Sequence, residues 1–305
     1  MKPESMPDTA ETLYNPDKLY SAGYVRDLLL YHDIRLKKNL GQNFMIDRHG
    51  VDKIIKAANI SSDDIVLEVG SGIGNLTYQL LQKAKQVISV EIDDRFLPII
   101  KGLFGKFDNL TLVHADILKV NLKKRFDELG FYPDKVVANV PYYITTPILT
   151  TLVQSGILFE SATFTMQKEV AMRYVANPGT KAYGSISVVI NYWGKPRLCS
   201  TLPARCFFPQ PKIESSIMTI QMHKEPPVGI ANEKLFYKIV RAAFSKRRKM
   251  LRNSLGTIEN DGYSVRKALM AANIDETRRA ESLSLNEFAK LTDSIIEQTG
   301  KLKID

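Results

Sequence analysis

The sequence predicts an α/β protein in which a mostly parallel sheet, covered by helices on both faces, precedes a small domain made only of helices. Short apolar runs that are typical of strands alternate with helical stretches in the first part of the chain. This alternation is typical of parallel sheets. After His223-Lys224-Glu225-Pro226-Pro227 no convincing strand follows, and apolar residues recur at helical spacing. The proline pair therefore predicts a domain boundary.

The elements follow from local patterns, taken in chain order. Residues 1–23 are mostly polar, contain prolines and lean acidic, which is typical of a flexible arm. One helix is predicted from Tyr24 and a second from Asp47 to Ala58. Buried-strand patterns then occur at 64–69, 86–91, 110–114, 135–140, 161–166, 186–192 and 213–222.

Beyond the proline pair, the pattern predicts amphipathic helices. Apolar residues recur close to the helical period at Phe236, Val240, Phe244, Leu251 and Leu255, while Lys246, Lys249 and Asn253 fall on another side. We therefore assign residues 24–225 to the sheet domain and residues 226–305 to the helical domain.

Composition indicates a basic, globular protein. Hydrophobic residues make up 44% of the 305 residues, which is enough for an ordinary core. Because no apolar run approaches the roughly 20 residues of a membrane helix and no signal peptide is evident, we expect a cytoplasmic protein. The formal charge of +9 favours polyanionic partners. Cys199 and Cys206 lack a ligand pattern around them, so neither a metal site nor a disulfide is predicted.

Polar residues and glycines mark the ends of the first predicted strands. The first strand runs into Gly70 and Gly72, which let a ligand approach the backbone closely. Glu91 ends the second strand, where a carboxylate can accept hydrogen bonds from both hydroxyls of a ribose, and Asp116 and Asn139 follow the next two. The carboxyl ends of parallel strands form the crevice in which open α/β sheets bind ligands.

Each of these features also has a structural interpretation. The glycines can form a tight turn without a ligand, and strand-end carboxylates often cap the following helix. The spacing Gly-x-Gly-x-Gly differs from the dinucleotide fingerprint Gly-x-Gly-x-x-Gly, which disfavours an NAD-dependent enzyme.

The segment Asn139-Val140-Pro141-Tyr142 indicates chemistry on a nucleobase. An adenine amino nitrogen is a poor nucleophile while its lone pair is delocalised into the ring. The Asn139 side-chain oxygen and the Val140 carbonyl can accept its two hydrogens, which favours a lone pair that faces an electrophile. Pro141 stiffens the turn, and Tyr142 can stack on the base. The alternative is a loop that merely leaves a strand.

With these motifs identified, the chain resembles the class I S-adenosylmethionine-dependent methyltransferases, and among them the ribosomal RNA adenine dimethyltransferases of the small subunit. The resemblance covers roughly residues 35 to 300. It rests on Asn39-Leu40-Gly41-Gln42-Asn43-Phe44, Glu68-Val69-Gly70-Ser71-Gly72, Val90-Glu91-Ile92-Asp93, Asp116, Asn139-Val140-Pro141-Tyr142, Met166-Gln167-Lys168-Glu169-Val170-Ala171, Phe207-Phe208-Pro209-Gln210-Pro211-Lys212-Ile213-Glu214-Ser215 and Arg247-Arg248-Lys249-Met250-Leu251-Arg252-Asn253-Ser254-Leu255. It implies a Rossmann-like sheet and S-adenosylmethionine as cofactor.

The resemblance also implies roles for individual residues. Gln42, Asn43 and Met45 close over the donor, Gly70 and Gly72 lie beside its methionine portion, Glu91 holds its ribose and Asp116 its adenine. The other predicted donor-binding residues are Ile92, Ile117 and Asn139. The catalytic residues are Asn139, Val140, Pro141, Tyr142 and Phe207, of which Tyr142 and Phe207 stack on the target base. Ser71 and Val140 depart from the commonest family pattern, but neither removes a group that the chemistry needs.

RNA docking is assigned to basic residues in both domains. They are Arg35, Lys37 and Lys38 near the cavity entrance, and Lys246, Arg247, Arg248, Lys249 and Arg252 in the helical domain. By charge pattern alone, a solvated helix face is an equally good interpretation.

The implied function is transfer of methyl groups to the amino groups of two adjacent adenosines near the 3′ end of small-subunit RNA, in ribosome biogenesis. Transfer is direct and in line, without a metal, on an unpaired or flipped-out base. We expect a monomer that acts on RNA within a precursor particle and not at a membrane. The alternatives are a large-subunit RNA methyltransferase of macrolide-type resistance and a non-catalytic assembly or transcription factor. The run from Arg247 to Leu255 favours the first function over the resistance enzyme, and intact Glu91, Asp116 and Asn139 argue against lost activity.

Overall fold

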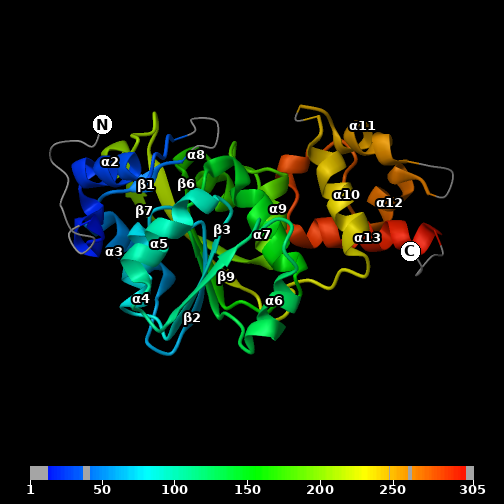
Figure 1. Cartoon of the computed structure of the whole chain (residues 1–305). Helices are drawn as coiled ribbons and strands as arrows, with labels where there is room; N and C mark the ends of the chain where they lie inside the picture. The colour runs from blue at the N-terminus through cyan, green and yellow to red at the C-terminus, as the bar shows by residue number, and fades with distance from the viewer. Residues whose placement is uncertain (1–12, 37–41, 247, 260–262, 300–305) are drawn as a thin grey trace. The chain divides into compact units, whose positions relative to one another are not determined.

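The computed structural model of the chain describes residues 13–36, 42–246, 248–259 and 263–299 (Figure 1). The chain divides into two compact units. The first unit contains the residues up to Ala171 together with Arg197–Met222. The second unit contains Met172–Pro196 together with the residues from His223 on.

A seven-stranded sheet in the order β4-β3-β2-β5-β6-β9-β7 organises the first unit. Its strands are β2 (Ile65–Val69), β3 (Gln86–Glu91), β4 (Leu110–His114), β5 (Lys135–Ala138), β6 (Ser161–Gln167), β7 (Gly194–Leu202) and β9 (Ser215–Met222). The strands from β4 to β6 pair in parallel, and β9 pairs antiparallel with β6. The predicted α/β architecture is therefore confirmed.

Helices pack on this sheet and bury its strands. Those of the first unit are η1 (Pro16–Tyr20), α2 (Ala22–Tyr31), α3 (Arg48–Ala58), α4 (Asn75–Leu81), η3 (Asp94–Phe96), α5 (Leu97–Phe104), α6 (Leu122–Leu129), η4 (Tyr142–Ile144), α7 (Thr145–Gln154) and η5 (Ala204–Cys206), while α8 (Lys168–Tyr174) spans the division. Helix α3 packs against β5, β6 and β9, and α4 packs against β3. All four residues of β5 are buried, as expected for a strand in the middle of a covered sheet.

A two-stranded antiparallel pair joins two distant parts of the chain. Strand β1 (Phe44–Met45) pairs with β8 (Phe207–Phe208), with Met45 opposite Phe207. Sequence patterns did not predict either strand, because two residues are too few to show a period. The pairing brings the segment at 42–45 beside Phe207.

The predicted flexible arm is wrong for its described part, residues 13–23. Asn15 caps η1 by accepting a hydrogen bond from the Asp17 amide, and Ser21 caps α2. Leu13 and Leu19 are buried in the same core as α3, α4 and α5. Two apolar side chains in a mostly polar stretch are therefore sufficient to pack this segment against the core. Residues 1–12 lie outside the described residues.

The strand predicted at 186–192 is also wrong, because this run forms helix α9 (Ser185–Trp193). Its β-branched composition is typical of strands, but tertiary packing overrides propensity. The Ser187 hydroxyl accepts a hydrogen bond from the Gly184 amide and donates one to the Arg173 carbonyl, which stabilises the start of the helix. Helix α9 packs on two helices of the second unit.

The second unit is helical, as predicted. Besides α9 it contains α10 (Glu233–Phe244), α11 (Leu251–Leu255), η6 (Gly256–Ile258), α12 (Val265–Ala271), η7 (Ala280–Ser282) and α13 (Leu285–Thr299). The predicted apolar positions Phe236, Val240, Leu251 and Leu255 are buried. The units change over at Met222, near the predicted boundary at 225, but Met172–Pro196 also belongs to the helical unit. None of the helices in the described ranges combines the length and apolar composition of a membrane span.

Candidate active site

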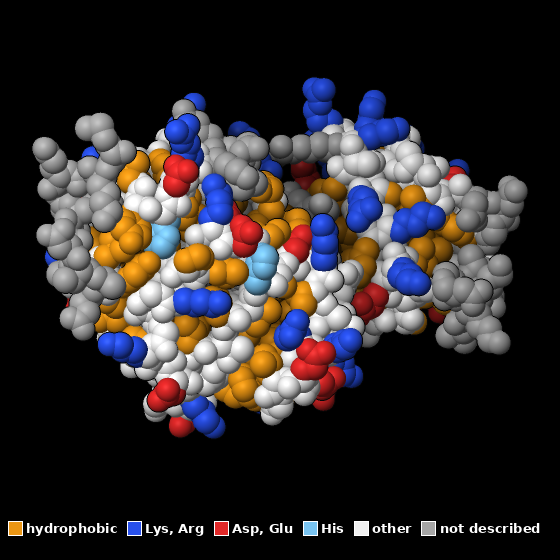
Figure 2. Space-filling model, in the orientation of Figure 1, with side chains coloured by type: hydrophobic (Ala, Val, Ile, Leu, Met, Phe, Trp, Pro, Cys, Tyr) orange, Lys and Arg blue, Asp and Glu red, His pale blue; other side chains and the backbone are white. Residues whose placement is uncertain are grey.

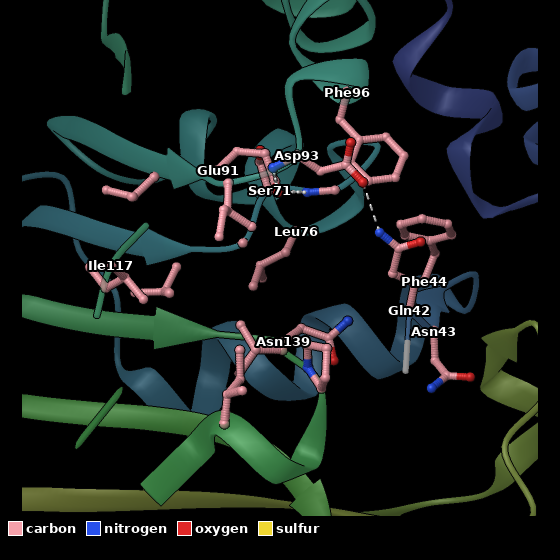
Figure 3. Close-up of a pocket in the computed structure, with 18 of the residues that line it drawn as sticks. Gln42, Asn43, Phe44, Ser71, Leu76, Glu91, Asp93, Phe96, Ile117 and Asn139 are labelled. Carbon is pink, nitrogen blue, oxygen red and sulfur yellow. Dashed lines mark hydrogen bonds between the residues drawn. The ribbon is translucent and has the colours of Figure 1, made fainter. Parts of the chain in front are cut away.

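A cavity of about 310 Å³ lies at the carboxyl ends of the parallel strands in the first unit. This volume is within the roughly 300–1,000 Å³ typical of small-molecule sites. Every residue predicted to hold the donor or to act in catalysis lines it, namely Gln42, Asn43, Met45, Gly70, Gly72, Glu91, Ile92, Asp116, Ile117, Asn139, Val140, Pro141, Tyr142 and Phe207. Figure 3 shows Ser71, Glu91 and Asp93 on one side of this cavity and Asn139 facing them from the other.

The glycine turn after β2 has a backbone conformation that residues other than glycine rarely adopt. Gly70 and Gly72 have φ angles of +79° and +53°. A Cβ atom on Gly72 would lie 2.8 Å from the Phe44 ring, and one on Gly70 would lie 3.0 Å from a methyl of Val140. Because Gly70 and Gly72 have no side chains, their backbone is exposed to the cavity. We call this turn the glycine cradle, and any larger residue there would fill the space.

Glu91 ties this turn to the end of β3. Its carboxylate accepts hydrogen bonds from the Gly72 amide at 2.8 Å and the Asp93 amide at 2.9 Å. Burial raises the pKa of Glu91, while the two backbone N–H groups act in the opposite direction. The Ser71 hydroxyl also donates to Glu91, at 3.5 Å. A carboxylate can accept about four hydrogen bonds, so Glu91 retains capacity for a hydroxyl group of a ligand.

The residue Gln42 at the cavity is held by a hydrogen bond to an ion-paired carboxylate. The Gln42 amide donates to an Asp93 carboxylate oxygen at 3.1 Å, as Figure 3 shows. Arg95 donates to both oxygens of Asp93, at 2.7 and 2.5 Å, and this contact is the largest of those that lower the pKa of Asp93. Phe44 packs edge to face on Phe96 with ring centroids 5.6 Å apart. Sequence reasoning assigned no role to Asp93 or Phe44, although both stood in the motifs.

Asp116 follows β4 and does not cap the following helix, α6, which is capped by Asn121. One Asp116 carboxylate oxygen accepts the Leu118 amide at 3.0 Å within a turn, and the other lies 3.6 Å from the Lys119 ammonium. Asp116 nevertheless lines the cavity between Ala115 and the buried Ile117. The helix-capping interpretation of Asp116 is therefore wrong, and its carboxylate remains at the cavity.

The Asn139 amide is fixed by a residue that sequence reasoning missed. The Thr165 hydroxyl, on the neighbouring strand β6, donates a hydrogen bond to the Asn139 side-chain oxygen. Thr165 is fully buried, so this contact sets which way the amide points. An amide oxygen has two lone pairs, so one remains for a ligand. The Val140 carbonyl accepts no hydrogen bond from any residue that the structure describes.

Aromatic side chains form the rest of this side of the cavity. The Tyr142 hydroxyl shares a 2.6 Å hydrogen bond with the Ser215 hydroxyl, and burial raises the pKa of Tyr142. Phe207 is almost completely buried. Tyr143 also lines the cavity but is 62% exposed, and the sequence analysis gave it no role. Its position directly after the Asn139 motif is the signal that was available.

The predicted basic residues occupy both units. Arg35, Lys246, Arg248 and Lys249 are exposed, and Arg252 forms an ion pair with Glu276 at 3.3 Å. Lys37, Lys38 and Arg247 lie outside the described residues. Figure 2 shows Lys and Arg side chains, with fewer acidic ones, on the visible face of the second unit. No described contact assigns these residues to a ligand, so their docking role stays a prediction.

Comparison with known proteins identifies the family. The model of the family described as ribosomal RNA adenine dimethylase matches residues 34–297. The chain belongs to the ribosomal RNA adenine dimethylase family. It is therefore an S-adenosylmethionine-dependent RNA adenine dimethyltransferase, as the motifs predicted.

Individual relatives agree with this family. The chain is 39% identical, over 92% of its length and 98% of the relative, to ribosomal RNA small subunit methyltransferase A of Alkaliphilus metalliredigens. It is 41% identical to the protein of that name from Enterococcus faecalis, over 88% of this chain and 94% of the relative.

Solved structures show the same fold. A dimethyladenosine transferase from Plasmodium falciparum is 28% identical, with a TM-score of 0.69 over 83% of this chain and 97% of that one. The 23S rRNA methyltransferase ErmE is 25% identical, with a TM-score of 0.62 over 83% of this chain and 99% of that one.

The residues present fit the methyl donor of this family. The glycine cradle offers backbone where a Cβ would otherwise stand, Glu91 offers a carboxylate acceptor for a ribose hydroxyl, and Ile92 and Ile117 offer apolar contact for an aromatic base beside Asp116. When bound, S-adenosylmethionine supplies an electrophilic methyl group on a sulfonium centre.

Proposed function

We propose that this dimethylase methylates the amino groups of two adjacent adenosines near the 3′ end of small-subunit ribosomal RNA. The observation that carries the proposal is the pair of acceptors in the cavity, the Asn139 side-chain oxygen fixed by Thr165 and the Val140 carbonyl. Two acceptors match the two hydrogens of an adenine amino group. The names of the relatives, ribosomal RNA small subunit methyltransferase A, support the small subunit as the source of the RNA.

The residues of the chain act mainly by positioning and by hydrogen bonding. Asn139 and Val140 accept the amino hydrogens, which turns the nitrogen lone pair toward the donor side of the cavity. Pro141 restricts the turn that carries both acceptors, with φ at −52°. Tyr142 and Phe207 contact the faces of the base. Holding the reactants in line lowers the barrier by several kcal/mol, and in the best-oriented reactions this contribution reaches ~7–11 kcal/mol.

The target adenosine must leave its stack to enter this cavity, at a cost of a few kcal/mol. An unpaired loop within a precursor ribosomal particle reduces that cost, so we infer that such a particle, in the cytoplasm, is the substrate. The exposed cations Arg35, Lys246, Arg248 and Lys249 would contact phosphates, with binding that weakens as salt rises. The proposal includes a monomeric enzyme, because the proposed mechanism requires no residue from a second copy of the chain.

The test is transfer of labelled methyl from S-adenosylmethionine to three substrates in parallel: unmethylated small-subunit particles, their deproteinised RNA, and large-subunit RNA. Mass mapping of the product should find dimethyladenosine at two adjacent positions of the small-subunit RNA. Replacement Asn139→Ala should lower kcat roughly 10²- to 10³-fold, as expected for removal of one oriented hydrogen-bonding group.

The control for that variant is its affinity for S-adenosylmethionine, measured separately because Asn139 was also predicted to lie near the donor. The kcat values are compared at saturating donor, where a change in donor affinity no longer limits the rate. Label on large-subunit RNA alone would contradict the proposal and favour the resistance-type enzyme, while donor binding without transfer to any substrate would favour a non-catalytic factor.

A further inference from the structure

The N-terminal segment Leu13–Asp33 lies outside the residues that the family model matches, which begin at 34. It forms η1 and α2 and belongs to the first unit. Leu19, Val25 and Leu28 are 0–1% exposed. The segment thus packs into the same hydrophobic core as residues that line the cavity.

Two hydrogen bonds from the end of η1 converge on Asn75. The Asn75 side-chain amide donates to the Leu19 carbonyl at 2.6 Å, and the Tyr20 hydroxyl donates to the Asn75 carbonyl at 3.1 Å. Asn75 is the first residue of α4, directly after the glycine turn, and it lines the cavity while being only 4% exposed. The N-terminal segment therefore holds both the side chain and the backbone of a cavity residue.

Further contacts fix η1 in this position. The Tyr78 hydroxyl, on the next turn of α4, donates to the Asp17 carboxylate at 3.1 Å. The Tyr14 ring lies so close to α5 that a Cβ on Gly102 would be 2.5 Å from it. The segment thus contacts the two helices that follow β2 and β3, the strands whose ends carry the glycine turn and Glu91.

We propose that the end of η1, Leu19 and Tyr20, is a positioning element for the methyl donor, and that Tyr20 acts through Asn75 to hold the glycine turn in the arrangement that binds the donor. A turn that is already ordered loses less conformational freedom when the donor binds, so affinity is higher. The inference concerns donor binding in this cavity and does not depend on which RNA is methylated.

The experiment compares two full-length variants, each of which removes one hydroxyl from the same segment. Tyr20→Phe removes the bond to the Asn75 carbonyl. Tyr24→Phe removes a hydroxyl that donates to the Leu13 carbonyl at 2.6 Å and accepts from the Asn15 amide at 2.8 Å, without a hydrogen bond to Asn75. Donor Kd is measured by calorimetry with S-adenosylmethionine, alongside Tm, kcat and KM for RNA.

Tyr20→Phe should raise the donor Kd roughly three- to tenfold, the factor expected for the loss of one hydrogen bond. Its kcat at saturating donor and its KM for RNA should stay unchanged. Tyr24→Phe should lower Tm at least as much, yet leave the donor Kd unchanged. Rescue of Tm by a stabilising osmolyte should not restore the donor affinity of Tyr20→Phe.

Equal donor Kd values for both variants and the parent would overturn the inference, as would Kd changes that simply follow Tm in both. If the parent protein itself bound no S-adenosylmethionine, the donor assignment of the cavity would fail instead. The two failures are therefore distinguishable.

Discussion

The two sides of the cavity are held in different ways. On the side proposed to bind the donor, the Glu91 carboxylate bonds to backbone N–H groups of Gly72 and Asp93, so main chain fixes the geometry. On the side proposed to bind the target base, Asn139 and Tyr142 are held by the hydroxyls of Thr165 and Ser215. Those hydroxyls come from β6 and β9, a pair of antiparallel strands that are distant in sequence.

This difference indicates how each side tolerates change. A site built from main chain depends on backbone conformation and on the absence of side chains, so added atoms damage it most. A site built from side chains depends on specific polar groups, so removed atoms damage it most. Three substitutions test this contrast, in addition to the Asn139 and Tyr20 variants described above.

The largest effect is expected for Gly72→Ala on the donor side. Alanine at φ +53° is strained by ~1–2 kcal/mol, and its Cβ at 2.8 Å from the Phe44 ring adds overpacking of about 1–3 kcal/mol. Donor Kd should therefore rise by more than tenfold, as measured by calorimetry.

The matched control is Gly156→Ala, which has φ at +72° but no atom within 4 Å of its added Cβ. It carries the backbone strain without the contact and lies outside the cavity lining, so it should lower stability and leave donor Kd unchanged. If Gly72→Ala bound the donor as tightly as this control, the glycine cradle would be contradicted.

The second prediction concerns Glu68, which is fully buried beneath the glycine turn. Ser89 and Thr77 donate to one carboxylate oxygen at 2.7 Å each, and the other oxygen has no partner among the described residues. Burial raises the pKa of Glu68 from 4.5 to about 7, with the nearby Glu91 carboxylate acting in the same direction. The folded protein thus retains a proton that the unfolded chain releases.

Stability should therefore fall as pH rises from about 4.5 to about 7, since the folded state binds more protons across that range. The loss is at most about 3 kcal/mol, from 1.36 kcal/mol per pKa unit. Urea unfolding at pH 5 and pH 7.5 measures it, and Glu68→Gln should remove most of the dependence. The same pH dependence in parent and variant would show that Glu68 does not hold this proton.

The smallest effect is expected for Tyr143→Ala on the target side. Tyr143 is 62% exposed at the cavity, and we propose that its ring stacks on a nucleotide beside the target. Loss of one stacked base costs about 1–3 kcal/mol, so KM for RNA should rise about fivefold or more while donor Kd stays constant. Leu158→Ala, which removes a side chain that is 83% exposed and outside the cavity lining, serves as the control. An equal KM for RNA in both variants would show that Tyr143 does not contribute to RNA binding.

Sequence patterns located most of the donor side because one continuous strand–turn–helix carries it. Gly70 and Gly72 follow a buried strand, and Glu91 ends the next, so parallel pairing alone brings them together. The same reasoning failed for 186–192 and for 13–23. Short apolar runs do not show whether a helix or a strand will bury them, and Leu13 and Leu19 were too few to mark a packed segment.

The sequence by itself therefore determined the α/β class, the helical C-terminal unit and the strand-end residues of the cavity, since each depends on local period and spacing. Only the tertiary structure decided the rest: that β1 pairs with β8 to place Phe207 at the cavity, that Thr165 orients Asn139, and that Leu19 and Tyr20 hold Asn75. These contacts join residues far apart in the chain. Their partners are chosen by packing and by the need to satisfy buried polar groups, which no local pattern records.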